Sequence, residues 1–160
     1  MISETKLNLK SENIQLSDSR GRILSKGLAS KVNDPRFDNS AMDGWAVKEA
    51  DCKSNKNTVL KIIGSIQAGS REITSLHRGE ACKITTGAPI PDGADAIVIV
   101  EDSKTEGENV IISGPARKTF IRKKGENLSK GNEALPKGSY MTAAAISLAA
   151  TMGHDMVTVY

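Results

Sequence analysis

Residues 95–101 read DAIVIVE, an unbroken apolar run between two acids. A run this short and without alternation is typical of a strand buried on both faces. Working outward, three other short segments also favour strands: 58–63 (TVLKII), 81–84 (ACKI) and 109–113 (NVIIS). We expect 109–113 to be the hairpin partner of 95–101, with the turn at 105–108. Short strands at this spacing predict an irregular β-rich, barrel-like domain.

The C-terminal part of the chain has a different pattern. Thr142 is a good N-cap for an alanine-rich helix, and Gly153 is placed to end it. A strand then starts at 156–160. It must pair locally or with a segment beyond the chain, so we expect a longer protein. The fold class is expected to be mixed α+β, predominantly β. The helical spacing predicts a buried face made of Ala145, Leu148, Ala149 and Met152.

Composition limits the class of protein. The 160 residues are 38% hydrophobic and 26% charged, as in globular domains. No apolar run approaches a membrane span, and the N-terminus lacks a signal peptide, so we expect a soluble cytoplasmic protein. Cys52 and Cys82 have no CxxC spacing and are expected to be inert thiols. His77 and His154 lie far apart without a zinc-ligand pattern, so we expect no histidine metal site.

Positive charge is concentrated in residues 117–130. This segment has six basic residues and one acid, a local net charge of +5 in a chain of net charge +3. A solvated basic loop is the simpler interpretation, and an anion site is the alternative. A glycine between the basic cluster and a carboxylate could place phosphate contacts beside a polar group. Phe120 is its one aromatic residue, so stacking on nucleic-acid bases is not expected.

The loop at 84–95 reads ITTGAPIPDGAD and joins two of the expected strands. Two threonines precede a glycine, and a glycine lets backbone N–H groups turn outward. Such a loop can hold an oxyanion with its N–H groups and hydroxyls. A rigid connection between strands is the alternative that spacing alone favours.

Residues 38–47 read DNSAMDGWAV and have neither a helical nor a strand period. Asp43-Gly44 is a strong turn dipeptide, and Asp43 is the one carboxylate on that turn. A turn aspartate usually bonds to its own backbone, so a structural role is the alternative to a functional one. The sequence contains no P-loop, no GxGxxG motif and no Ser/His/Asp arrangement.

Three segments in this order, DNSAMDGWAV, ITTGAPIPDGADAIVIVED and IRKKGENLSKGNEALPKG, resemble the N-terminal half of molybdopterin molybdenumtransferases. The E domain of gephyrin is an animal relative. The resemblance runs from about Ile14 to Tyr160. It implies insertion of molybdate into adenylylated molybdopterin with release of AMP, assisted by a divalent cation such as Mg²⁺. It also implies an elongated homodimer.

The resemblance further implies two domains here, a small discontinuous one at 1–38 with 132–160 and an inserted β-rich one at 39–131. Two more domains would follow, so we expect the 160-residue chain to be inactive alone. The family's site lies between protomers, and the inserted domain supplies its side of the cleft in trans. A non-enzymatic scaffold or an anion-binding module of the same family is the alternative.

The resemblance assigns roles to single residues. Asp43 corresponds to the family's essential carboxylate, acting through a bound metal ion or as a proton acceptor. Thr86 faces the same cleft and, with the loop N–H groups, would orient oxyanions. The family usually has Met at Thr85, Tyr at Trp45 and Asp at Asn127, and an amide at 127 cannot supply charge to a cation. The expected substrate- and anion-binding residues are Ser40, Thr85, Gly87, Arg122, Gly125, Glu126 and Asn127.

Overall fold

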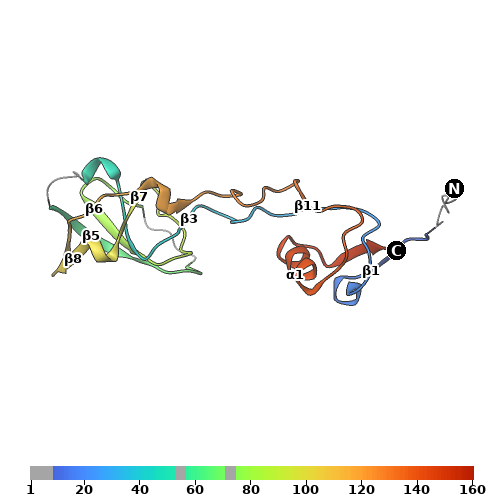
Figure 1. Cartoon of the computed structure of the whole chain (residues 1–160). Helices are drawn as coiled ribbons and strands as arrows, with labels where there is room; N and C mark the ends of the chain where they lie inside the picture. Colours follow the sequence, from blue (N-terminus) through green and yellow to red (C-terminus); the bar gives the residue numbers. More distant parts are fainter. Residues whose placement is uncertain (1–8, 53–56, 71–74) are drawn as a thin grey trace. The chain divides into compact units, whose positions relative to one another are not determined.

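The computed structural model describes residues 9–52, 57–70 and 75–160. The chain divides into two compact units: unit 1 comprises Met1–Arg36 with Asn127–Tyr160, and unit 2 comprises Phe37–Glu126. In Figure 1 the blue and red ends of the chain come together in unit 1, and the green and yellow middle forms unit 2.

The boundaries of this division differ from those expected, because residues 127–131 bond to the first segment of unit 1. Asn127 N donates to Asp34 O at 3.0 Å, and Gly131 N donates to Ser30 O at 2.8 Å. The second boundary therefore lies after residue 126 rather than 131. At the first boundary Asp38 belongs to unit 2, where its carbonyl accepts from Ile90 N at 3.1 Å.

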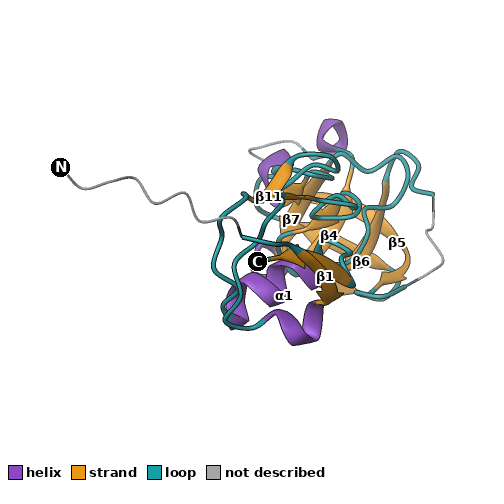
Figure 2. Ribbon diagram, turned by 90° about the vertical axis from the view of Figure 1, so that its right-hand side faces the viewer, coloured by secondary structure: helices purple, strands orange, loops and turns teal. Residues whose placement is uncertain are grey.

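Unit 2 is built on one six-stranded sheet in the order β7-β4-β6-β5-β9-β8. All neighbours are antiparallel except β5 and β6, which are parallel. Figure 2 shows the strands lying side by side in a curved sheet. Strands predominate over one α-helix in the described residues, which confirms the expected fold class. The sheet strands are β4 (Gly44–Val47), β5 (Thr58–Ile66), β6 (Glu80–Ile84), β7 (Ala96–Ile99), β8 (Ser103–Glu106) and β9 (Asn109–Ile112).

Strand β4 lies inside the sheet, and all four of its residues are buried. Trp45 and Val47 pack into the core on one face, and Ala46 packs into the core on the other. Trp45 Nε1 also donates to Ser103 Oγ at 2.9 Å. Burial on both faces removes the alternation that marks a strand in sequence, so 38–47 did not indicate one.

The predicted hairpin between 95–101 and 109–113 is wrong. Strand β7 pairs with β4, whereas β9 pairs with β8 and β5. The apolar run leaves the sheet after Ile99 and enters the 3₁₀ turn η3 (Val100–Asp102), which separates β7 from β8. A turn does form within the expected residues 105–108, where Gly107 has φ +59°. It joins β8 to β9, however, and not β7 to β9.

Unit 1 contains the helix α1 (Ala143–Thr151) and two small sheets. As expected, Thr142 caps the helix, because its side chain accepts from Ala145 N at 3.1 Å. Gly153 follows the helix end with φ +91°. Within the described part of the chain, no helix is long and apolar enough to cross a membrane. The paired strands are β1 (Glu12–Gln15) with β12 (Met156–Val159), and β2 (Leu28–Ala29) with β11 (Glu133–Leu135).

The expected helix face is wrong at one position. Leu148 is 37% exposed, whereas Ile146 packs against the core of unit 1 with Ala145 and Ala149. The helix α1 has apolar residues on all of its sides, so the spacing of these residues in the sequence does not determine which side is buried. The other short elements are β3 (Asn39–Ser40), β10 (Ile121–Arg122), η1 (Leu16–Ser19), η2 (Glu49–Asp51) and η4 (Lys118–Phe120).

Gly44→Ala is expected to lower the free energy of unfolding by about 3 kcal/mol or more, because overpacking against backbone cannot relax easily. An added Cβ at Gly44 would lie 2.0 Å from Val98 O. Gly107→Ala is the control: φ there is +59° and an added Cβ meets no atom within 4 Å, so only backbone strain of about 1 kcal/mol is expected. Urea unfolding measures both, and equal losses would contradict the steric argument.

Candidate functional site

Strand β3 brings together the three segments that the sequence singled out. Ser40 pairs with Ile121 of β10, in the basic segment. The backbone of Ser40 also bonds to the loop after β6, donating to Ala88 O at 3.0 Å and accepting from Gly87 N at 2.8 Å. Segments 38–47, 84–95 and 121–122, far apart in sequence, therefore meet at one strand of unit 2.

Asp43 projects from the turn between β3 and β4 and is exposed. Its Oδ1 accepts two hydrogen bonds from Thr86, one from the backbone N at 2.6 Å and one from Oγ1 at 2.9 Å. The Asp43 carbonyl accepts from Val100 N at 3.1 Å, which ties the turn to the end of β7. Its Oδ2 has no hydrogen-bond partner among the described residues. One carboxylate oxygen is thus held in place, and the other is open.

The two bonds from Thr86 stabilise the ionised form of Asp43. The backbone N–H of Thr86, followed by its hydroxyl, lowers the pKa of the Asp43 carboxyl below its ordinary value. Asp43 is therefore a fixed negative charge at neutral pH.

Ser40 stabilises the turn that carries Asp43 through hydrogen bonds to Met42. It is 0% exposed, and its Oγ donates to Met42 O at 2.6 Å and accepts from Met42 N at 3.2 Å. Both bonds close the chain around residues 40–42, directly before Asp43. Because its hydroxyl is buried and engaged, Ser40 is placed to hold the turn rather than to contact an anion, which differs from the sequence expectation.

The loop at 85–88 is held by hydrogen bonds within unit 2. The hydroxyl of Thr85 accepts from Ala68 N at 3.1 Å, and Gly87 has φ +81° in the turn. From the sequence, this loop could be an oxyanion site or a rigid connection between strands. In the structure it holds Asp43 through Thr86. All four successive backbone N–H groups donate within unit 2: Thr85, Thr86, Gly87 and Ala88.

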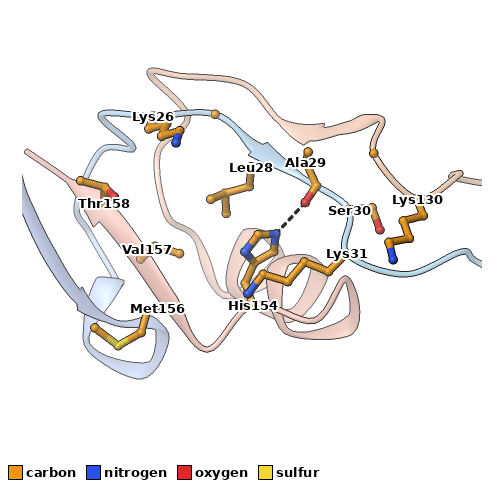
Figure 3. A pocket seen from close by; sticks show the side chains of 12 residues that line it. Lys26, Leu28, Ala29, Ser30, Lys31, Lys130, His154, Met156, Val157 and Thr158 are labelled. Carbon is orange, nitrogen blue, oxygen red and sulfur yellow. Dashed lines mark hydrogen bonds between the residues drawn. The ribbon is translucent and has the colours of Figure 1, made fainter.

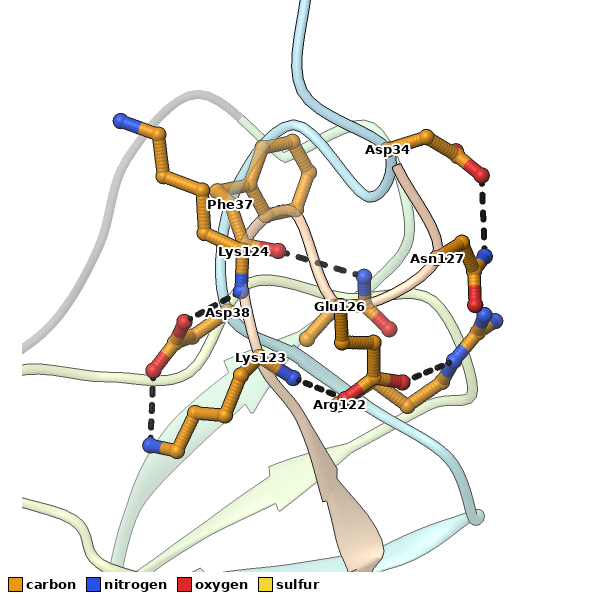
Figure 4. Close-up of polar contacts among 9 residues, drawn as sticks. Asp34, Phe37, Asp38, Arg122, Lys123, Lys124, Glu126 and Asn127 are labelled. Atoms are coloured by element: carbon orange, nitrogen blue, oxygen red, sulfur yellow. Dashed lines mark hydrogen bonds and ion pairs between the residues drawn. The ribbon is translucent and has the colours of Figure 1, made fainter. Parts of the chain in front are cut away.

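Glu126 folds back onto the basic turn (Figure 4). Its Oε1 accepts from Arg122 Nε at 3.2 Å, and its Oε2 accepts from Lys123 N at 2.7 Å. Gly125 has φ +77°, which lets the chain reverse between them. The Gly-Glu pair therefore orients Arg122, and the terminal nitrogens of that guanidinium have no hydrogen-bond partner in the described part of the chain.

Acids distant in sequence compensate part of the basic segment. Asp38 accepts from Lys123 Nζ at 2.8 Å and from Lys124 N at 2.8 Å, and these bonds lower the pKa of the Asp38 carboxyl. Lys118 pairs with Glu49 at 2.8 Å. Three of the six basic residues, Lys118, Arg122 and Lys123, thus form ion pairs with Glu49, Glu126 and Asp38, so the positive charge of the segment is partly compensated in the fold.

Asn127 belongs to unit 1, where its Nδ2 donates to Asp34 Oδ2 at 2.9 Å. An aspartate at 127 would set two carboxylates against each other, which is unfavourable. The amide is matched to Asp34.

Cys52 is half-buried and Cys82 is buried. Burial, reinforced by Asp51 and Asp95, raises the pKa of Cys52 to about 11, and burial raises the pKa of Cys82. Both thiols are free. Nowhere in residues 9–52, 57–70 and 75–160 do three or more His, Cys, Asp or Glu side chains cluster as a metal site.

These features define a class of protein: a curved β-sheet unit is inserted between the two segments of a small discontinuous unit, and it carries one oriented carboxylate on its surface. Residues 1–153 match the family model described as the MoeA N-terminal region, domain I and II. The chain belongs to this family.

Similar proteins agree with this assignment. A molybdopterin molybdenumtransferase of Synechococcus elongatus is 37% identical over 159 residues, covering 96% of this chain and 40% of that protein. The Haemophilus influenzae molybdopterin molybdenumtransferase is 31% identical over 162 residues, covering 100% of this chain and 40% of that protein. A molybdopterin biosynthesis MoeA protein from Pyrococcus horikoshii OT3 superimposes with a TM-score of 0.87 at 28% identity, over 94% of this chain and 41% of that structure. The chain thus spans about 40% of the length of these curated relatives.

Thr86→Val is expected to raise the pKa of Asp43 while leaving it below its ordinary value, because the larger contribution, from the backbone N–H of residue 86, remains. A depressed pKa stabilises the fold only while Asp43 is ionised, so this contribution disappears as pH falls through the folded-state pKa. Carbon-detected NMR titration of the carboxyl measures the pKa. Thr105→Val in β8 is the control and should leave the pKa of Asp43 unchanged. An unchanged Asp43 pKa in Thr86→Val would contradict the role of the Thr86 hydroxyl in lowering that pKa.

Ser40→Ala is expected to lower the free energy of unfolding by about 1–2 kcal/mol, because it removes the side-chain bonds to Met42. The same variant should raise the pKa of Asp43, since the looser turn weakens both bonds from Thr86. Ser113→Ala removes an exposed serine hydroxyl bonded to Asp102 O and is the control. A loss of stability without any change in the Asp43 pKa would show that Ser40 does not position the carboxylate.

Proposed function

We propose that this chain is the N-terminal part of an enzyme that inserts molybdate into adenylylated molybdopterin and releases AMP. Membership of the MoeA N-terminal region family and the names of the relatives support this proposal. In the proposal the enzyme is a cytoplasmic homodimer, and unit 2 forms one side of a cleft completed in trans by the partner subunit. The 160 residues alone do not catalyse, since they span about 40% of the relatives' length.

The observation that carries the proposal is the Asp43 carboxylate. It is exposed, ionised and held through one oxygen by Thr86, and its other oxygen is open. Molybdate and a pyrophosphate bond are anionic, so a bare carboxylate repels them. Asp43 must therefore act through a cation or accept a proton.

The residues present fit a shared Mg²⁺ site. Mg²⁺ keeps several waters and is usually held by one or two carboxylates together with substrate phosphates. Asp43 supplies one open carboxylate oxygen, and the described residues hold no cluster that would form a complete protein site. Mg²⁺ bound there would offset negative charge on the substrates. The lowered pKa makes Asp43 a weak base and therefore favours this role over proton acceptance.

Thr86 takes a positioning role in this proposal, because its N–H and hydroxyl both donate to Asp43. Ser40, Thr85 and Gly87 support the same arrangement through the bonds described above. Arg122 is the proposed contact to an anionic substrate group, since Glu126 holds its Nε and leaves the terminal nitrogens open. Gly125 and Glu126 orient that guanidinium.

An anion-binding module without catalysis has less support. Such a module would use the loop at 85–88, whose N–H groups are all engaged within unit 2. A scaffold would not need an exposed carboxylate kept ionised by two donors. Both alternatives leave the arrangement of Asp43 and Thr86 without a purpose.

In the full-length protein, Asp43→Asn is expected to reduce molybdate insertion at least about 100-fold, because an amide accepts the Thr86 bonds but supplies no charge to a cation. The free energy of unfolding should change by less than about 1 kcal/mol. Conversion of adenylylated molybdopterin to the molybdenum cofactor, followed by AMP release, measures activity.

Asp92→Asn is the matched control, since Asp92 also precedes a glycine and is exposed in unit 2. It should retain full activity. The isolated 160-residue chain should show none. Activity in the Asp43→Asn protein close to that of the Asp92→Asn protein would rule out the proposed role of Asp43.

A further inference from the structure

Unit 1 contains a pocket of about 610 Å³ between the segments 26–31 and 154–158 (Figure 3). Backbone bonds close both ends: Ser25 N donates to Thr158 O at 2.9 Å, and Lys31 N donates to Met152 O at 2.9 Å. Between these ends the two segments separate. Because both walls are tied to the backbone of the unit, the pocket is formed by the fold itself.

The floor of the pocket is apolar. Leu28 and Val157 are buried, with 7% and 2% exposure. His154 stands between the two segments, and its Nε2 bonds to Ala29 O at 2.8 Å. Nε2 is the donor in this bond, because a carbonyl oxygen can only accept. In Figure 3 the other ring nitrogen is turned away from Ala29.

The rim of the pocket is basic. Lys26, Lys31 and Lys130 line it, and no acid is among its lining residues. Lys26 and Lys130 have no side-chain ion pair within the described parts of the chain. Cationic groups above an apolar floor attract a ligand that is both charged and apolar.

Two acids lie near this rim without lining the pocket. Asp155 pairs with Lys31 at 3.7 Å, and both side chains are largely exposed. Glu133 lies beside Gly27, where an added Cβ would be 2.8 Å from its Oε1. These acids offset part of the charge of three lysines, so the rim keeps a positive excess.

We propose that this pocket binds a small organic anion, a phosphate or carboxylate group attached to an apolar body. The apolar body packs on Leu28 and Val157, and the anionic group lies at the basic rim that Lys26, Lys31 and Lys130 form. The volume of about 610 Å³ suits such a ligand, since small-molecule sites span roughly 300–1,000 Å³. The proposal concerns unit 1 alone and does not depend on the role of Asp43.

Phenyl phosphate is the first probe, titrated into the ¹⁵N-labelled full chain and followed by amide chemical shifts. Saturable shifts are expected at residues that line the pocket, such as His154 and Thr158. Inorganic phosphate should bind more weakly, because it lacks the apolar body. Phenylacetate is the second probe, and the tighter of the two aromatic anions identifies the preferred charged group.

Lys26→Gln combined with Lys130→Gln should weaken phenyl phosphate binding about tenfold, the loss of roughly 1.4 kcal/mol. Lys61→Gln combined with Lys83→Gln removes the same charge from two exposed lysines of unit 2 and should leave binding unchanged. The proposal is overturned by no saturable binding of either probe. Equal binding of inorganic phosphate, or equal weakening by both double variants, would overturn it as well.

Discussion

Gly44 lies so close to the backbone of Val98 that a Cβ atom on it would sit 2.0 Å from the carbonyl oxygen. Only glycine allows β4 to begin here and to pair with β7 on one side and β6 on the other. Asp43 directly precedes Gly44, so the start of the buried strand β4 fixes the position of Asp43 at the surface. The packing of the sheet and the position of the carboxylate are consequences of the same contact.

The surrounding polar groups are arranged around that carboxylate. Thr86 gives both its N–H and its hydroxyl to one oxygen of Asp43, and Ser40 joins the turn to the loop through its side chain and backbone. The backbone N–H groups of residues 85–88 are thereby used within unit 2. The basic segment follows the same rule, because Glu126 and Asp38 engage Arg122 and Lys123. Among the described residues, one Asp43 carboxylate oxygen and the terminal nitrogens of Arg122 have no hydrogen-bond partner.

Local features could be predicted from the sequence. The strands at 58–63 and 81–84 lie within β5 and β6, and the helix starts at its Thr142 cap, because β-branched content and capping are properties of adjacent residues. Pairings between distant segments could not be predicted. Strand β4 lacks alternation of apolar and polar residues because both its faces are covered. The strand partner of 109–113 depends on the turn η3, and the apolar run 95–101 gives no sign of that turn in the sequence.

The site shows the same limit. Asp43 and Thr86 were indicated by resemblance to a family and not by spacing, since 43 residues separate them. Their hydrogen bonds, the burial of Ser40 and the inward donors of the loop exist only once the segments meet. Asn127 is similar, because its hydrogen bond to Asp34 joins residues that are 93 positions apart in the sequence.

The most direct test is a high-resolution crystal structure of the full-length protein with Mg²⁺ and adenylylated molybdopterin. The account predicts that Asp43 Oδ1 keeps both bonds from Thr86 while Oδ2 contacts the cation, or a water bound to it, beside the substrate phosphates. An Asp43 side chain turned away from the bound substrate, or a cation held without it, would contradict the account.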